Sequence, residues 1–346
     1  MQELSASLRE GNELGRQEVD AAAQALLSDH CDEEAKADFL RALADKGESA
    51  REVAYFVEAF LDRAVAPGIQ GGGDGEPLLD VCGTGGDQLD LFNVSTASVF
   101  ILAGGGVKVV KHGNRGITSK SGGADVLEAL GIAIELPPGD LVRSVREVGA
   151  GFLFAPLYHP AFKSVAPVRA ILAREGRRSI FNILGPLLNP ARPDCQLIGV
   201  FRRELVPMFG EILAALGRRR AWVAHGTTAE GGAMDEISTL GPTTVVRTEG
   251  AVVGPQEELD LAGISLAPAS LADLVGGDAK TNAAILEAVL DGSERGPRRE
   301  IVVLNAAAGL VVAGRAEAIA EGVAMADEII DRGDARRVLE GMRNFS

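Results

Sequence analysis

Residues 80–87 form the first segment whose composition suits the binding of an anion. They read Asp-Val-Cys-Gly-Thr-Gly-Gly-Asp and follow a short apolar run that is typical of a buried strand. Glycines let backbone N–H groups approach an anion closely, and the positive end of a following helix adds to the attraction. The segment is neither a Walker loop nor a GxGxxG fingerprint. It is interpreted as an anion-binding turn, with a purely structural turn as the alternative.

Asn93, Ser95 and Thr96 extend this segment to the start of a helical run at 95–103. Their side chains offer an amide and two hydroxyl groups. They are also common N-cap residues, so capping is the alternative interpretation for Ser95 or Thr96. Because a helix needs only one cap, three polar side chains favour a binding role.

A second polar segment lies between a predicted strand at 107–110 and the start of a helical run at 124–130. It contains Lys-His-Gly-Asn-Arg at 111–115 and Thr-Ser-Lys-Ser-Gly-Gly-Ala-Asp at 118–125. The formal net charge of the chain is −15, so a polyanionic substrate needs a locally basic site. Cations and hydroxyl groups between glycines favour a polyphosphate site over a solvated loop.

Asp235 and Glu236 are adjacent carboxylates after Met234. Such a pair can hold two magnesium ions through waters while the oxygens of a pyrophosphate complete the coordination shells. Most Asp-Glu pairs are solvated surface charges, so this pair gains meaning only from the pyrophosphate site predicted elsewhere.

A third set of candidate binding residues consists of Tyr158, His159, Phe162 and Arg169. Aromatic surface and a cation could receive a planar carboxylate. A buried helix that carries one surface arginine is the alternative, and the residues alone favour it. Residues 181–190 are interpreted as a rigid turn that shapes a domain interface.

Helical periodicity dominates the residues before about 65, with apolar stripes such as Val19, Ala23 and Leu26. Ser49 and Glu52 have the spacing of a capping box. Residues 67–75 contain three consecutive glycines and predict a break after a small helical domain. Apolar runs and helical runs then alternate, which predicts an α/β domain with a mostly parallel sheet whose ligands bind beyond the carboxyl ends of the strands. Further strands are expected at 78–82, 151–154, 197–201, 221–224 and 244–247, and further helices at 204–216 and 318–332.

The composition excludes several classes of protein. With 49 acidic and 34 basic residues, the chain repels polyanions, so neither a nucleic acid nor an anionic membrane is an expected partner. The N-terminus lacks the apolar core of a signal peptide, and no apolar run is long enough to span a bilayer. The three cysteines form no CxxC pair. We expect a cytoplasmic protein with reduced cysteines.

Taken together and in order, these motifs resemble the anthranilate phosphoribosyltransferase family of tryptophan biosynthesis, one of the phosphoribosyltransferases of glycosyltransferase family 3. The resemblance covers about residues 78–240 and rests on GTGGD, FNVSTA, KHGNR, SGGAD, YHPAF, VAPVR, FNILGPLLNP and MDE. It implies a small helical domain (1–70, with a returning segment near 160–190), a large α/β domain (76–346) and an active-site cleft between them. It also implies a homodimer joined through the helical domain, and two magnesium ions in each active site.

The resemblance also implies roles for individual residues. Lys111 and Arg169 would act in catalysis, and Ser95, Asp235 and Glu236 would hold the metal. The residues implied for phosphoribosyl pyrophosphate are Gly83, Thr84, Gly85, Gly86, Asp87, Asn93, Ser95, Thr96, Lys111 and Ser119. Those implied for the aromatic amino acid, anthranilate, are His112, Asn114, His159 and Arg169.

Three alternatives stay open. Between Arg169 and Phe181 the chain is about three residues longer than is usual in the family, so a transferase for another aromatic acid is one alternative. A pyrimidine nucleoside phosphorylase shares the architecture but has no use for a metal pair that bridges a diphosphate. A catalytically silent relative that binds nucleic acid is expected to be basic and to lack these loops.

Overall fold

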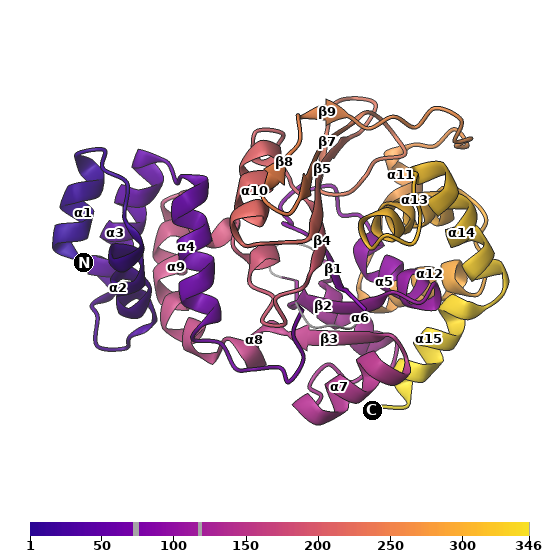
Figure 1. Ribbon diagram of the computed structural model, residues 1–346, viewed down its shortest axis with the longest axis horizontal. Helices are drawn as coiled ribbons and strands as arrows, with labels where there is room; N and C mark the ends of the chain where they lie inside the picture. The colour runs from indigo at the N-terminus through magenta and orange to yellow at the C-terminus, as the bar shows by residue number, and fades with distance from the viewer. Residues whose placement is uncertain (72–75, 117–119, 346) are drawn as a thin grey trace.

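The computed structural model describes residues 1–71, 76–116 and 120–345. Four helices form a bundle at one end of the molecule (Figure 1): α1 (Gln2–Arg9), α2 (Arg16–Leu27), α3 (Glu33–Lys46) and α4 (Ala50–Leu61). The predicted stripe Val19, Ala23 and Leu26 is fully buried in the bundle. The predicted capping box is confirmed at the start of α4, where the Glu52 N–H donates to Ser49 Oγ and the Ser49 N–H donates to Glu52 Oε2.

A later segment of the chain returns to this bundle. The 3-10 helix η1 (Pro160–Val165) packs on α2, and α9 (Ala166–Arg174) packs on α3, beside α4 in Figure 1. Val168 and Leu172 of α9 share one apolar core with the four helices. Two further 3-10 turns, η2 (Ile180–Asn182) and η3 (Gly185–Leu187), lead back to the sheet.

In the described part of the chain, nine strands form one sheet, ordered β3-β2-β1-β4-β5-β7-β8, with β6 on β5 and β9 on β7. The strands are β1 (Leu78–Gly83), β2 (Lys108–Gly113), β3 (Ala150–Phe154), β4 (Cys195–Gly199), β5 (Arg220–Thr227), β6 (Ala233–Met234), β7 (Thr243–Glu249), β8 (Val252–Val253) and β9 (Glu257–Glu258). The remaining helices are α5 (Val94–Gly104), α6 (Gly123–Ala129), α7 (Pro138–Glu147), α8 (Ala155–Tyr158), α10 (Leu205–Ala215), α11 (Leu271–Leu274), α12 (Ala279–Leu290), α13 (Pro297–Val312), α14 (Ile319–Asp331) and α15 (Asp334–Arg343).

Helices cover both faces of the sheet. Along β4, Leu197 points into the core formed with α5 and α13, whereas Ile198 points into the core formed with α10 and the helical bundle. Apolar residues on both faces explain why the strands read as continuous apolar runs. The helical bundle is thus joined to the α/β domain through α4 and α10, which lie side by side.

The predicted fold class, with its mostly parallel sheet, is confirmed, and the predicted ends of two strands are wrong. The sheet is parallel only from β3 to β5 and is antiparallel from β5 to β7, because no helix between β5 and β7 carries the chain back. Strand β2 continues to Gly113, since its pairing with β3 extends through Lys111 and His112. Strand β4 ends at Gly199, before Phe201.

Other expectations concern the chain as a whole. All three cysteines lie in the described residues, and none of them forms a disulfide. No helix in the described ranges is both long enough and apolar enough to cross a bilayer. The predicted break at 67–75 falls partly outside the described residues.

Candidate active site

The acidic pair lies across the carboxyl edge of the sheet, where β1 and β4 end in glycine and β5 has a glycine one residue before its end. A Cβ atom added at Gly83 of β1 would overlap the Asp235 carboxylate, and one at Gly199 of β4 would overlap the Asp235 carbonyl. A Cβ at Gly226 of β5 would overlap the Glu236 carbonyl. The strand order reverses between β1 and β4, which is where ligands of such sheets bind.

The loop after β1 holds the first carboxylate of the pair. Gly85 and Gly86 have φ of +70° and +85°, a conformation that glycine adopts without a steric penalty. This conformation turns the Gly85 N–H toward Asp235 Oδ2, to which it donates at 2.6 Å. Asp87 lies near enough to interact with the Asp235 side chain.

Helix α5 holds the second carboxylate. The Ser95 N–H, in the first turn of α5, donates to Glu236 Oε1 at 3.1 Å, so the positive end of the helix faces this carboxylate. Lys111 Nζ donates to Ser95 Oγ at 3.1 Å and to Val81 O at 2.6 Å. Ser95 therefore joins the lysine to the acidic pair, and the structure brings Gly85, Lys111 and Glu236 together at one place.

The carboxylates of the pair are hard to ionise without a counterion. Desolvation raises the pKa of both Asp235 and Glu236 above the usual carboxylate range. Negative charge raises the pKa further, from Asp87 on Asp235 and from Asp235 on Glu236, whereas Lys111 and the Ser95 N–H lower that of Glu236. A divalent cation would remove this repulsion.

This set of donors fits magnesium, which prefers oxygen ligands and keeps several of its waters. Among the described residues, no group of three His, Cys, Asp or Glu side chains is arranged to hold a metal by itself. A cation beside Asp235 and Glu236 would therefore complete its shell with water and with substrate oxygens.

Several predicted binding residues have structural hydrogen bonds. Thr84 Oγ1 accepts from the Phe201 N–H at 3.1 Å, which ties the glycine loop to the end of β4. Asn93 Nδ2 donates to Ser121 O, and Asn93 Oδ1 accepts from Asn282 Nδ2. Thr96 is buried. Asn93 is the N-cap residue of α5 but makes no side-chain capping bond, so capping does not account for these polar side chains.

The second polar segment is less basic than its sequence predicts. Arg115 forms ion pairs with Asp125 and Glu128, and Lys120 forms one with Asp90. Among the described cations of this segment, only Lys111 is linked to the acidic pair, through Ser95, and it extends from strand β2 rather than from a loop. Ser119, predicted to bind the donor, lies outside the described residues.

Two of the predicted acceptor residues, His112 and His159, pack edge to face with ring centroids 5.4 Å apart. Burial lowers the pKa of His112 to about 3, so its ring is neutral at physiological pH. The ring bonds to the backbone of Gly185, whereas Nε2 is buried without a hydrogen-bond partner in the described residues. His159 Nε2 bonds to Leu188 O at 2.8 Å, and burial also lowers its pKa.

The other two acceptor residues are less confined. Asn114 is exposed, and its Oδ1 accepts from the Arg115 N–H at 2.8 Å. Arg169 is exposed on α9, although desolvation by nearby atoms lowers its pKa. It has no ion pair or hydrogen bond with any residue that the structure describes, so its guanidinium can receive an anion.

Three residues that position the site were not predicted. Gly199 and Gly226 leave the space that the acidic pair occupies. Asn305 of α13 fixes the next residue, because its Oδ1 accepts from the Ile237 N–H and its Nδ2 donates to Ile237 O, both at 2.9 Å. A lone asparagine in the apolar run 301–312 was the available signal.

Comparison with known proteins identifies the family to which the chain is similar. The α/β domain of the glycosyl transferase family matches residues 75–336, and the helical bundle domain of that family matches residues 2–64. The anthranilate phosphoribosyltransferase of Rubrobacter xylanophilus is 44% identical over 333 residues, which are 95% of this chain and 93% of that protein.

Solved structures give the same result. The anthranilate phosphoribosyltransferase of Thermus thermophilus has a TM-score of 0.88 and 38% identity, covering 99% of this chain and 98% of that one. The Saccharomyces cerevisiae enzyme in complex with PRPP and Mg has a TM-score of 0.86 and 26% identity, covering 99% and 97%. The chain therefore belongs to the anthranilate phosphoribosyltransferase family, within the glycosyl transferase family whose two domains it matches.

Proposed function

We propose that this chain transfers the 5-phosphoribosyl group of phosphoribosyl pyrophosphate to the amine of anthranilate, giving N-(5-phosphoribosyl)anthranilate and pyrophosphate, as a step of tryptophan biosynthesis. The observation that carries the proposal is the place where Ser95 links Lys111 to Glu236 while the Gly85 N–H bonds to Asp235. A glycine loop, a cation and two carboxylates around one point suit a diphosphate with its metal ions.

The donor would lie along the glycine loop and the start of α5. Gly83, Gly85 and Gly86 carry no side chains, so the backbone of this loop can approach the pyrophosphate closely, while the Gly85 N–H stays bonded to Asp235. Asp87, Asn93, Ser95 and Thr96 would contact the donor, with Thr84 holding the loop in place. Ser119 is proposed from the family resemblance alone.

Magnesium bound between Asp235, Glu236 and the donor would neutralise negative charge on the departing pyrophosphate, and two ions per site are proposed. Lys111 would add a fixed positive charge, and because it is already bonded to Ser95 it needs no reorganisation when that charge develops. The amine attacks the anomeric carbon as the bond to pyrophosphate breaks, and the amine proton passes to water. No nucleophilic side chain is needed.

The acceptor would lie beside the two histidines. Because the neutral His112 ring is bonded to Gly185 through one nitrogen, its unpartnered Nε2 can accept a hydrogen bond from the aromatic amine. Arg169 would bind the carboxylate, and Asn114 and His159 would line the site. Holding both substrates in reactive geometry supplies up to about 7–11 kcal/mol of the barrier reduction.

An acceptor panel with phosphoribosyl pyrophosphate and magnesium tests the proposal, with the loss of anthranilate fluorescence as the first readout. We expect turnover of anthranilate that stops when EDTA is added. If another aromatic acid is turned over and anthranilate is not, that acid would replace anthranilate as the proposed acceptor. Phosphorolysis of uridine or thymidine without magnesium would refute the transferase proposal.

We further propose two domains, residues 1–70 with the returning segment and residues 76–346, with the active-site cleft between them. By family resemblance, we propose a cytoplasmic homodimer joined through the helical domain. Sedimentation equilibrium tests the assembly, and a monomer at micromolar concentration would refute it.

A further inference from the structure

Two arginines lie at the edge of the glycine loop, outside the residues discussed so far. The guanidinium carbon of Arg178 lies 4.4 Å from the centroid of the Phe201 ring, and that of Arg202 lies 5.3 Å from the same centroid. Both arginines are exposed, whereas Phe201 is buried beneath them. Stacking on an aromatic ring holds a guanidinium in place while its N–H groups remain available to an anion.

Phe201 connects these arginines to the proposed donor site. Its N–H donates to Thr84 Oγ1, and the Thr84 N–H donates to Gly199 O at 2.9 Å. A Cβ at Gly86 would lie 4.0 Å from the Phe201 ring. The ring that carries both guanidinium groups is thus packed against the loop whose backbone would approach the pyrophosphate.

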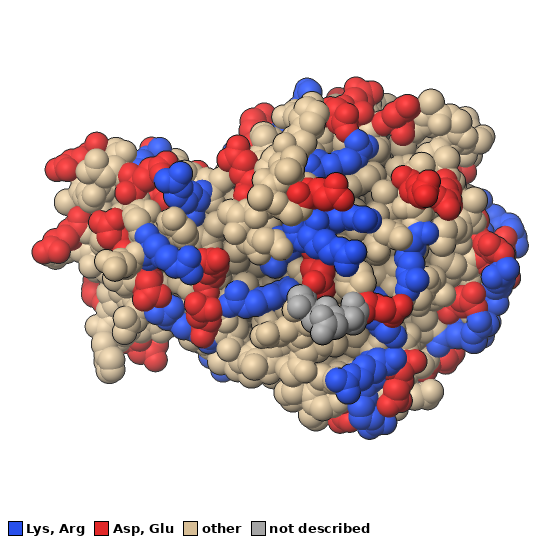
Figure 2. Space-filling view, in the orientation of Figure 1, with Lys and Arg blue, Asp and Glu red and all other residues tan. Residues whose placement is uncertain are grey.

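Neither arginine is neutralised. Arg178 and Arg202 have no ion pair or hydrogen bond through their guanidinium groups with any residue in the described ranges, and Glu48 interacts with Arg202 only at longer range. Arg115 and Lys120, the cations that the sequence favours, are paired with carboxylates. Figure 2 shows Lys and Arg side chains gathered near the centre of the face viewed there.

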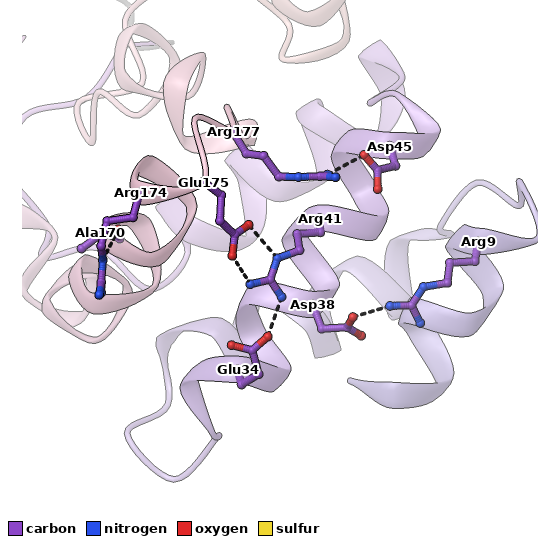
Figure 3. A network of polar contacts seen from close by, with 9 residues as sticks. All are labelled: Arg9, Glu34, Asp38, Arg41, Asp45, Ala170, Arg174, Glu175 and Arg177. Carbon is purple, nitrogen blue, oxygen red and sulfur yellow. Dashed lines mark hydrogen bonds and ion pairs between the residues drawn. The ribbon is translucent and has the colours of Figure 1, made fainter.

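Side-chain contacts with helix α3 hold the segment directly before Arg178. Arg41 of α3 donates to both oxygens of Glu175, at 2.9 and 2.6 Å, and also bonds to Glu34. Arg177 bonds to Asp45 at 2.7 Å. Figure 3 shows both contacts tying residues 175–177 to α3. The returning segment is thus anchored to the helical bundle directly before Arg178.

We propose that Arg178 and Arg202 form a second anion-binding element of the donor site, which binds the outer oxygens of the pyrophosphate group from the side opposite the metal. This rests on the proposed function, because it assigns these residues to the same donor. Two unpaired cations at this edge also give a protein of net charge −15 a local attraction for a polyanion.

The test is calorimetric titration of inorganic pyrophosphate with magnesium into the full-length protein and its variants. Arg178→Gln and Arg202→Gln are each expected to weaken pyrophosphate binding roughly fivefold, about 1 kcal/mol, and the double variant more than either. The salt dependence of binding should decrease in each variant. Arg174→Gln is the matched control, because within the described ranges this exposed arginine of the same segment bonds only to Ala170 O. The control variant should bind pyrophosphate as the original protein does.

Further variants separate charge from packing. Arg178→Lys keeps the charge and should recover part of the lost affinity. A lysine variant as weak as Arg178→Gln, with an unchanged salt dependence, would overturn the proposal, as would a double variant within about twofold of the original protein. If the original protein binds pyrophosphate but neither substitution changes the affinity for it, this inference fails and the proposed function stands. If the original protein does not bind pyrophosphate, both fail.

Discussion

Gly199→Ala should displace the acidic pair and remove most of the activity. The added Cβ would lie at less than half of the ordinary 3.4–4 Å contact distance from the Asp235 carbonyl and 3.1 Å from the Glu236 N. Both neighbours are backbone atoms, so no side-chain rotation relieves the overlap. To restore an ordinary contact, the 235–236 backbone must retreat by roughly 2 Å.

The size of the effect follows from this displacement. A misplacement of about 1 Å at reacting groups can cost on the order of 100-fold in rate, so we expect kcat/KM for phosphoribosyl pyrophosphate to fall by about 100-fold or more. Overpacking should also lower the free energy of unfolding by about 1–3 kcal/mol. The magnesium concentration needed for half-maximal rate should rise, because the two carboxylates no longer face the loop and α5.

The assay is initial-rate kinetics with varied donor and magnesium, with circular dichroism to confirm folding. Gly139→Ala is the control, because its Cβ would have no neighbour within 4 Å in an exposed part of α7. If Gly199→Ala does not fold, Gly83→Ala provides the test, since its Cβ meets the Asp235 carboxylate, which can rotate. A folded Gly199→Ala protein with original kcat/KM and magnesium dependence would refute the placement of the acidic pair.

Three further predictions follow from the contacts of the site. Arg169→Ala should raise KM for anthranilate about tenfold and leave that for the donor nearly unchanged; equal changes in both would contradict its role. Asn305→Ala leaves the Ile237 N–H and carbonyl without their buried partner, so thermal unfolding should show a loss of about 1–3 kcal/mol, and an unchanged melting curve would contradict this. Because the pKa values of Asp235 and Glu236 are raised, these two groups without metal bind more protons in the folded protein than in the unfolded chain from about pH 4 through neutrality, whereas the lowered pKa values of His112 and His159 act in the opposite direction at acidic pH. The contribution of the acidic pair to the free energy of unfolding should therefore fall as pH rises through that range, and saturating magnesium should remove this contribution. Thermal unfolding that shows the same pH slope with EDTA and with magnesium would count against the prediction.

Much of the fold could be predicted from periodicity. Apolar stripes at helical spacing located α2 and α4, and apolar runs located the parallel strands, because both patterns are set by burial in the nearest core. The orientation of β7 could not be predicted in this way, since a strand buries the same apolar side chains in either direction. The end of β2 was also missed, because Lys111 and His112 are polar residues whose strand pairing depends on β3.

The site was only partly predictable, because residue type does not reveal a residue's partner. Arg115 and Lys120 have the composition of a phosphate site, yet their charges are taken up by Glu128 and Asp90. Arg178 had no motif of its own, and its proximity to the glycine loop depends on Phe201 from another part of the chain. Pairing of this kind is decided by tertiary packing.

The glycines at or next to the ends of β1, β4 and β5 have one common cause. These three strands are neighbours in the sheet, and the 235–236 segment crosses their ends where side chains would otherwise project. Asp235 raises the pKa of Glu236, and Lys111 is the cation among the described residues that lowers it. Attraction between charges therefore does not hold the pair in place. Steric complementarity with Gly83, Gly199 and Gly226, together with the bonds to Gly85 and Ser95, fixes both carboxylates before any metal arrives. Folding of the sheet thus positions the two carboxyl groups although their pKa values are raised, and divalent cations of the substrate complex would favour their ionised forms.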